Sequence, residues 1–353
     1  MYTPRILLVL WLGFFCLTLK SQSGSELFYR MYADYGLSSD KTTVSLQDHL
    51  GFMWFGTEEG LNRMSGYSEF EIFRNSRIDS SSISHNYVSA LFEDSKGRLW
   101  VGTKDGLNLY NRAKRTFAHF PLQHGLSDLG GSTIVDIQQD KNGDLWVLSD
   151  KHLIQLDRNT LEEKLLVEAL GTAERKEGRL TRLTIFQSEV WVASSSGLLK
   201  LKDEKLVDSG LIGAIPVTSL LSADSTLWFG TKGNGIYRWD VSKNLVKQYS
   251  NDVVAHSLTS NFINDIHHVA GEELWIATDD GINVLNLNTG FFKSHKYDFN
   301  NGFSVSDKVL RRVYEDRDGA VWITTPNSGI SYYHKADNLF KYFGQSQENG
   351  TSK

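Results

Sequence analysis

A tryptophan phrase recurs along the whole chain, and its period constrains the fold more than any other feature of the sequence. Each copy places a Trp between apolar residues and usually continues with a small residue, a Thr or Ser, and a Gly. Intervals between successive copies run from 37 to 47 residues, and a near-constant period of this size indicates a repeat architecture. The seven tryptophans are Trp54, Trp100, Trp146, Trp191, Trp228, Trp275 and Trp322.

Each repeat predicts four short strands. In the second unit, residues 86–94 alternate apolar and polar side chains, and residues 95–97 supply a turn. Further strands are expected over 98–103, 106–111 and 116–120. Four antiparallel strands in about forty residues is the size of a propeller blade. We therefore predict an all-β fold, a seven-bladed β-propeller of four-stranded antiparallel blades over residues 26–343.

The spacing inside the phrase recurs from repeat to repeat, and it indicates a structural role for each residue. We expect each indole to wedge between adjacent sheets, so that truncating one ring costs about 3–5 kcal/mol. The small residue two positions later leaves room for this contact, the Thr or Ser hydroxyl holds a turn, and the Gly permits a positive φ. The third unit has His152 in place of this Gly, and the fourth is preceded by residues 160–178, for which we expect a short helix or a protruding loop.

The chain contains one candidate outer strand more than seven blades require. Residues 27–32 (LFYRMY) and 339–343 (LFKYF) both resemble outer strands. We expect the N-terminal segment to complete the seventh blade, which leaves residues 339–343 as the beginning of a further region. The alternative is that residues 339–343 close the ring. Residues 344–353 form a polar tail, and we interpret the chain as the front part of a longer protein.

Residues 1–23 are predicted to be a signal peptide. Arg5 precedes a run of 14 apolar residues, 6–19, which suits a secretory segment and is short of the roughly 20 residues of a membrane span. Ser21 and Ser23 fit the cleavage site, and an uncleaved anchor is the alternative. Cys16 is the only cysteine, so the mature chain would have no disulfide, thiolate metal site or Cys nucleophile.

Net charge argues against two classes of partner. The formal charge of −5 is spread without long runs of one sign. Neither nucleic acid nor an anionic membrane surface is indicated by such a pattern.

Three segments resemble the two-component regulator propeller repeat: residues 51–74, 92–120 and 314–343. Residues 92–120 carry, in order, Glu-Asp, Gly, an apolar-Trp-apolar-Gly-Thr phrase and Gly-Leu-Asn, and the other two segments carry parts of this series. The resemblance extends over about residues 27–343. It implies the periplasmic sensor region of a hybrid two-component histidine kinase that detects an oligosaccharide and regulates transcription. Full members usually continue into a second propeller, a membrane span and a kinase.

No kinase motif is found in the sequence, so we expect this chain not to be an enzyme, whereas a longer form would be a histidine kinase. The resemblance implies a periplasmic location, with the full-length form anchored in the inner membrane. It also implies a histidine kinase partner, in cis or in trans, and is compatible with a homodimer.

The Asp-x-x-Gly turns at Asp48, Asp94, Asp140 and Asp316 are expected to be hairpin turns. Residues 140–144 weakly resemble a calcium loop, but the 12-residue spacing and the closing Glu are missing. We therefore predict neither a metal site nor a cofactor.

Polar side chains are expected to converge on one face of the ring, where the loops before the third strands and the connections into the innermost strands meet. A ring of convergent polar groups is how a propeller binds a polar ligand. Solvated loop charge is the alternative for each residue. Our candidates for ligand binding are Glu58, His85, Asn86, Lys104, Asp105, Asn234, Asp279, Asp280 and Asn327.

Aromatic and histidine residues near this face receive other predictions. Tyr87 and Phe262 are expected to pack in the core, and the alternative is that their rings cover the apolar face of a bound sugar. His267 and His268 are neighbours on a predicted strand and point to opposite faces, so only one of them should pack or line the centre.

Two other functions remain open. A glycan hydrolase or lyase would need two carboxylates about 5–9.5 Å apart, for which Glu58, Asp105 and Asp279 are candidates. A scaffold for protein contacts would instead expose an apolar patch of several hundred Å².

Overall fold

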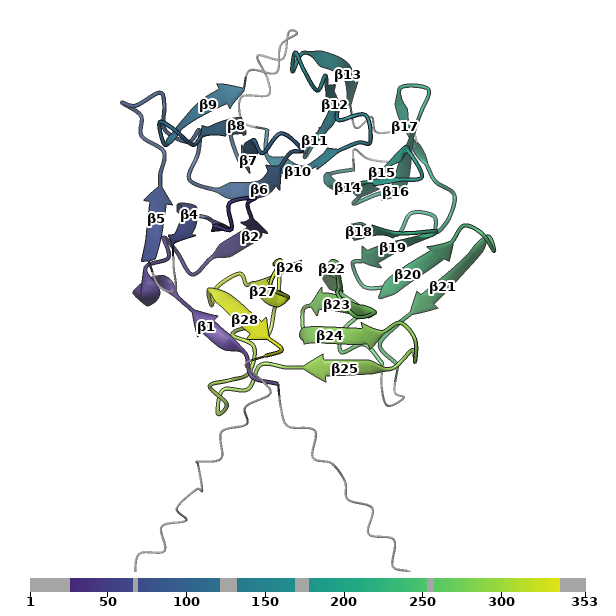
Figure 1. Ribbon diagram of the computed structural model, residues 1–353. Coiled ribbons are helices and arrows are strands. Elements are labelled where there is room, and N and C mark those ends of the chain that lie inside the picture. Colours follow the sequence, from purple (N-terminus) through teal and green to yellow (C-terminus); the bar gives the residue numbers. More distant parts are fainter. Residues whose placement is uncertain (1–25, 66–68, 121–131, 169–177, 253–256, 337–353) are drawn as a thin grey trace, which may run out of the picture.

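The computed structural model describes residues 26–65, 69–120, 132–168, 178–252 and 257–336. These residues form seven four-stranded antiparallel sheets arranged in a ring, with a single short 3-10 helix, η1 (Ala33–Tyr35) (Figure 1). The predicted seven-bladed propeller is confirmed. Among the residues described, no helix is both long and apolar enough to span a membrane.

Strands follow one another from the centre of the ring outwards in six of the blades (Figure 1). Blade 1 contains β2 (Thr42–Gln47), β3 (Met53–Thr57), β4 (Gly60–Ser65) and β5 (Glu69–Phe73). Blade 2 contains β6 (Val88–Glu93), β7 (Leu99–Thr103), β8 (Gly106–Asn111) and β9 (Thr116–Phe120). Blade 3 contains β10 (Ile134–Gln139), β11 (Leu145–Ser149), β12 (His152–Leu156) and β13 (Glu163–Glu168).

The second half of the ring has the same order. Blade 4 contains β14 (Leu180–Phe186), β15 (Glu189–Ser194), β16 (Gly197–Lys202) and β17 (Lys205–Asp208). Blade 5 contains β18 (Val217–Ala223), β19 (Thr226–Thr231), β20 (Ile236–Asp240) and β21 (Leu245–Tyr249). Blade 6 contains β22 (Ile263–Val269), β23 (Glu273–Thr278), β24 (Gly281–Asn286) and β25 (Phe292–His295). Blade 7 contains β26 (Arg312–Glu315), β27 (Ala320–Thr324) and β28 (Ile330–His334), with β1 (Tyr29–Met31) as its outer strand.

The N-terminal strand closes the ring, as expected from the sequence. β1 pairs antiparallel with β28, and Tyr29 lies opposite Tyr332. Phe28, which is 1% exposed, packs against Trp275 of blade 6. The closure therefore joins the two ends of the propeller by both hydrogen bonds and apolar contact. Residues 339–343 lie outside the described part of the chain.

The indoles separate neighbouring blades. All seven repeat tryptophans are at most 5% exposed. Trp54 of blade 1 lies 5.1 Å from the ring of Tyr110 in blade 2, in one apolar cluster with Val101. A Cβ added to Gly102 would lie 2.8 Å from Ile134 of the next blade, which confirms that this small residue permits the close approach.

The Asp-x-x-Gly turns are structural. Asp48 accepts hydrogen bonds through Oδ1 from the N–H groups of Leu50 and Phe52, and through Oδ2 from the indole of Trp54 at 2.9 Å. The equivalent indole bonds join Trp100 to Asp94, Trp146 to Asp140 and Trp322 to Asp316. Each of these carboxylates holds its hairpin turn and fixes the neighbouring indole.

The segment before the fourth unit, residues 160–178, departs from expectation. Residues 163–168 form the strand β13, paired with β12, so a helix over this part of 160–178 is wrong. Pairing at the blade edge outweighs the helix propensity of its Glu, Lys and Leu residues. Residues 169–177 lie outside the described part. Between β14 and β15, Gln187 and Ser188 both have positive φ and make the tight turn without an Asp-x-x-Gly sequence.

A candidate ligand site at the centre of the ring

The innermost strands surround the axis and begin on one face of the ring. Each of the seven contacts the innermost strands of its two neighbours. Six of them contain a register shift next to their first residue, which leaves one residue unpaired in the ladder. These unpaired residues are Thr43, Ser89, Val135, Thr181, Thr218 and Asn264, and Arg311 takes the same place just before β26.

The unpaired residues form a belt of hydrogen bonds from blade to blade. The Thr43 hydroxyl donates to the carbonyl of Val88 at 2.6 Å, in the next blade. Arg311 closes the circle by donating from Nη1 to the carbonyl of Thr42 at 3.1 Å. Corresponding bonds run from Ser89 to Ile134, Thr181 to Val217, Thr218 to Ile263 and Asn264 to Leu310. Val135 has no side-chain donor and interrupts the belt between blades 3 and 4.

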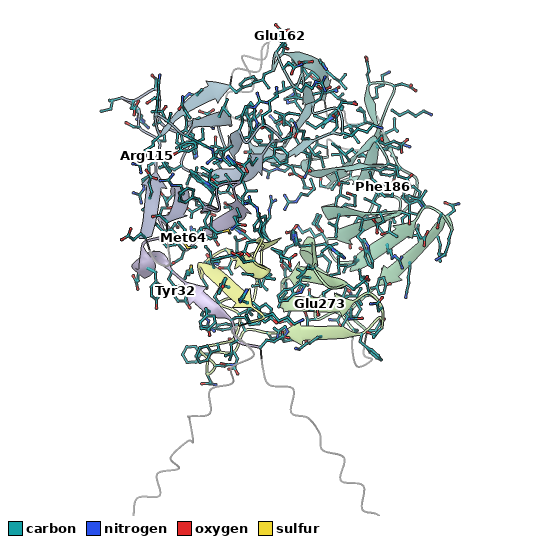
Figure 2. All side chains as sticks on the ribbon, viewed as in Figure 1. Tyr32, Met64, Arg115, Glu162, Phe186 and Glu273 are labelled. Carbon is teal, nitrogen blue, oxygen red and sulfur yellow. The ribbon has the colours of Figure 1, made fainter. Side chains whose placement is uncertain are left out.

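A cavity of about 380 Å³ opens directly on this belt, and we refer to it as the central cavity. Six of the seven blades contribute to its wall. The lining residues are Thr43, Tyr87, Ser89, Thr133, Val135, Arg179, Leu180, Thr181, Arg182, Asn264, Arg311 and Arg312. Figure 2 shows side chains that end in nitrogen reaching from the inner strands into the centre of the ring. This volume lies in the range of small-ligand pockets.

Two arginines cross the centre of the ring. Arg182 of β14 approaches Asp265 of β22, with 3.6 Å between Nη2 and Oδ1. Arg312 of β26 reaches the carbonyl of Val135 in blade 3, at 3.5 Å. Burial lowers the pKa of Arg312 to about 10, and the nearby cation of Arg182 acts in the same direction.

Two aspartates lie beside these arginines and are held by the backbone of the following blade. Asp136 accepts from the N–H of Leu183, and Asp265 accepts from the N–H of Val313, both at 3.0 Å. Burial raises the pKa of Asp136, against the attraction of the two arginines. The centre of the ring therefore contains a compact cluster of two cations and two carboxyl groups.

Two further arginines stand at the entrance. The side chain of Arg179 is 66% exposed and lies 3.9 Å from Asp150. Arg311 lies 3.4 Å from Glu58. Both contacts are long for ion pairs, so these guanidinium groups retain capacity for another acceptor.

Three of the predicted ligand residues touch the wall of the central cavity from outside. Glu58 pairs with Arg311 and, at 3.4 Å, with Lys41. Lys104 lies 4.3 Å above the ring of Tyr87. Asp279 accepts a 2.8 Å hydrogen bond from Asn264.

The other six predicted residues lie in the surrounding loops, and none of the nine is part of the wall itself. His85 accepts from the N–H of Tyr87, Asn86 accepts from the N–H of Asn75, and each contact organises its own connection. Asp280 pairs with Lys296 at 2.6 Å. Asp105, Asn234 and Asn327 are exposed at turns into the third strands.

The prediction that Tyr87 and Phe262 pack in the core is wrong. Tyr87 lines the central cavity, and Phe262 is 45% exposed. In both connections it is the following residue, Val88 or Ile263, that is buried as the inner strand begins. The histidine pair divides as expected: His267 accepts from the N–H of Glu315, whereas His268 is exposed.

The four arginines were not among the predicted ligand residues, although the sequence contains a signal for them. Residues 179–183 (RLTRL) and 310–314 (LRRVY) each place two arginines at the beginning of a predicted inner strand. Other repeats carry Thr, Ser, Val or Asn at the place of Arg311. Within the described ranges, no group of three or more His, Cys, Asp or Glu side chains is arranged to hold a metal ion.

The repeat sequence is shared with a known family. A family model described as the two-component regulator propeller matches residues 82–105 and 128–151. These two segments are similar to repeats of that family. A histidine kinase, P4, of Formosa agariphila is 37% identical over 76 residues, which cover 22% of this chain and 6% of that relative.

Solved structures share the fold. The extracellular domain described for a putative hybrid two-component system of B. thetaiotaomicron superimposes with a TM-score of 0.73 and 23% identity, over 87% of this chain and 42% of that chain. A streptogramin B lyase gives a TM-score of 0.64 and 15% identity, over 87% of this chain and 96% of that chain. This chain therefore covers less than half of the extracellular domain and 6% of the histidine kinase it matches.

Proposed function

We propose that this propeller is the extracytoplasmic sensing module of a two-component system and that it binds an oligosaccharide or another small polar ligand at the central cavity. The observation that carries the proposal is the convergence of polar side chains from six blades on one cavity. Hydroxyl, amide and guanidinium groups supply donors to sugar hydroxyls, while Tyr87 offers an aromatic face. Similarity to the two-component regulator propeller repeat and to a histidine kinase supports a role in signalling.

Signalling would follow from a difference in affinity between two arrangements of the propeller. A ligand that contacts several blades at once favours the arrangement in which those blades are correctly placed. The histidine kinase would lie in the same chain or in a partner, and the location would be the periplasm. The loop residues Glu58, His85, Asn86, Lys104, Asp105, Asn234, Asp279, Asp280 and Asn327 would form the outer part of the site.

Calorimetric titration of the purified chain with neutral and charged oligosaccharides tests this proposal. We expect saturable binding without turnover, and Tyr87→Ala should weaken it at least fivefold because one stacking face is lost. Lys205→Ala, on the exposed outer strand β17, is the control. Product formation would support the hydrolase or lyase alternative, and failure of every saccharide to bind would contradict a carbohydrate sensor.

Protein contact is a second candidate, favoured by a different surface. A groove of about 530 Å³ lies beside β1 and η1, and its wall is mostly aromatic. Tyr35 is 58% exposed there and Phe303 47%. Exposed aromatic side chains are typical of interface anchors. Sedimentation of wild type and Tyr35→Ser would test self-association through this groove, and equal monomeric behaviour of both would argue against a homodimer here.

A further inference from the structure

The arginines of the central cavity are paired with carboxylates at longer distances than Arg63 and Arg98 are. On the outer part of the ring, Arg63 lies 2.6 Å from Glu71 and Arg98 lies 2.6 Å from Asp94. In the central cavity, the shortest contact between an arginine nitrogen and a carboxylate oxygen is 3.4 Å. Within the described residues, no carboxylate oxygen forms an ion pair with Arg312. Strong charge-assisted bonds are shorter, about 2.7–2.9 Å.

Arg182 and Arg312, the two buried arginines, each belong to an aspartate–arginine arrangement that occurs at two junctions between blades. Asp136 and Arg182 meet at the junction of blades 3 and 4, and Asp265 and Arg312 meet at the junction of blades 6 and 7. In both, the aspartate accepts from the backbone N–H that follows the arginine in sequence. Each guanidinium then crosses the ring toward the opposite junction. The crossing brings two cations together at the base of the central cavity.

The aspartates cannot reorganise freely to pair with these cations. Each gives one oxygen to the backbone of the next blade, and this bond fixes the carboxyl group at the junction. Two like charges held close together in a buried place repel each other, and an anion between them relieves that repulsion. An oxyanion also matches the planar fork of guanidinium donors better than any neutral group does.

We propose that the central cavity selects an anionic saccharide, with a carboxylate or sulfate group of the ligand held between Arg182 and Arg312. This inference rests on the proposed sensing function and names the ligand class. Arg179 and Arg311 line the same cavity and attract the same charge, and Tyr87 is part of the same wall. The two sources of charge, uronate and sulfate ester, share one recognition chemistry and are separated by experiment.

The test is calorimetric titration of the full purified chain with three probes: oligogalacturonides, carrageenan-derived sulfated oligosaccharides, and neutral cello-oligosaccharides. One of the two anionic classes should bind at least tenfold more tightly than the neutral class. Its affinity should fall as sodium chloride is raised from 50 to 300 mM, since salt screens the charges. The preferred class identifies the group as carboxylate or sulfate.

Substitutions then locate the anion. Arg182→Gln and Arg312→Gln should each weaken binding of the preferred anionic class at least tenfold and leave any binding of the neutral class within twofold. Arg182→Lys keeps the charge but loses the planar fork, and should fall between wild type and Arg182→Gln. Arg158→Gln is the matched control, because this exposed arginine pairs near the turn of Asn142, away from the central cavity.

Substitutions of Arg179 and Arg311 test the same proposal if Arg182→Gln or Arg312→Gln prevents folding. Arg179→Gln and Arg311→Gln change more exposed side chains and should each weaken anionic binding about threefold or more. Neutral oligosaccharides binding as tightly as the anionic classes would overturn this inference and leave the sensing proposal intact. So would anionic binding that is unchanged in all four glutamine variants. Absence of binding by all three classes would overturn both.

Discussion

The indole hydrogen bond offers a prediction that two blades test against each other. Trp100 of blade 2 is fully buried, and its Nε1 donates to Oδ2 of Asp94 at 2.8 Å. Trp191 of blade 4 is 3% exposed, yet its Nε1 has no hydrogen-bond partner within the described residues. Replacing either with Phe removes a similar part of the ring from a similar place. Only the blade 2 substitution also breaks a bond to a charged acceptor.

The difference between the two variants isolates that bond. A hydrogen bond to a charged group contributes about 1.5–3 kcal/mol. Asp94 keeps its contact with Arg98, at 2.6 Å, so the carboxylate is not left without a partner. We therefore expect Trp100→Phe to lower the free energy of unfolding by about 1.5–3 kcal/mol more than Trp191→Phe does.

Urea unfolding followed by far-ultraviolet circular dichroism measures both variants without relying on tryptophan fluorescence. A double-mutant cycle with Asp94→Ala assigns the excess to the indole–carboxylate pair. Equal destabilisation by the two substitutions would refute the reasoning, as would an excess at Trp100 that persists in the Asp94→Ala background.

Three further predictions concern packing, pH and closure. Gly230→Ala should lower the free energy of unfolding in urea by about 1–3 kcal/mol, because the added Cβ would lie 2.4 Å from Ile263 of the next blade. An unchanged free energy would contradict the tight packing at this junction. Glu26 has its pKa lowered to about 2: burial opposes ionisation, but the hydrogen bond from His295 and its charge prevail, together with Lys293. The pKa of Glu26 in the folded state lies below the ordinary value, so its stabilisation is present above about pH 4.5 and is lost as the pH falls toward 2. Glu26→Gln should therefore make the melting temperature less dependent on pH between 4.5 and 2. An unchanged pH dependence would contradict this role of Glu26. Phe28→Ala should cost about 3–5 kcal/mol, since this buried ring joins β1 to blade 6, and a loss below 1 kcal/mol in thermal unfolding would show that closure depends on strand pairing alone.

The fold was predictable because each repeat contains the residues that define both its strands and its contact with the next blade. Each unit supplies an indole, a small residue and a turn within about fifteen residues, so local sequence defines both the strands and the contact between blades. Closure was less certain, since residues 27–32 and 339–343 have the same pattern. The pairing of β1 with β28 shows that residues 27–32 supply the outer strand of the seventh blade.

The central cavity was only partly predictable, for a physical reason. Which face of the ring gathers polar loops follows from strand order alone. Which side chains reach the axis depends on the bulge at the beginning of each inner strand, and hydrophobic periodicity does not register a single unpaired residue. Tyr87 was expected in the core, but the residue that the inner strand buries is its neighbour Val88.

The belt of hydrogen bonds suggests why the charged cluster occupies the places it does. Five junctions are bridged by neutral donors such as Thr43 and Asn264, whose bonds do not depend on any ligand. The junction of blades 3 and 4 lacks this bond at Val135, and Asp136 takes over the link to the next blade. Arg312 reaches the same junction from across the ring. A ligand that draws Arg312 or Arg182 toward itself therefore changes contacts between blades that are far apart in sequence, while the neutral part of the belt keeps the ring closed. If the propeller is a sensor, as proposed, ligand binding to Arg182 and Arg312 would change the positions of the blades relative to one another.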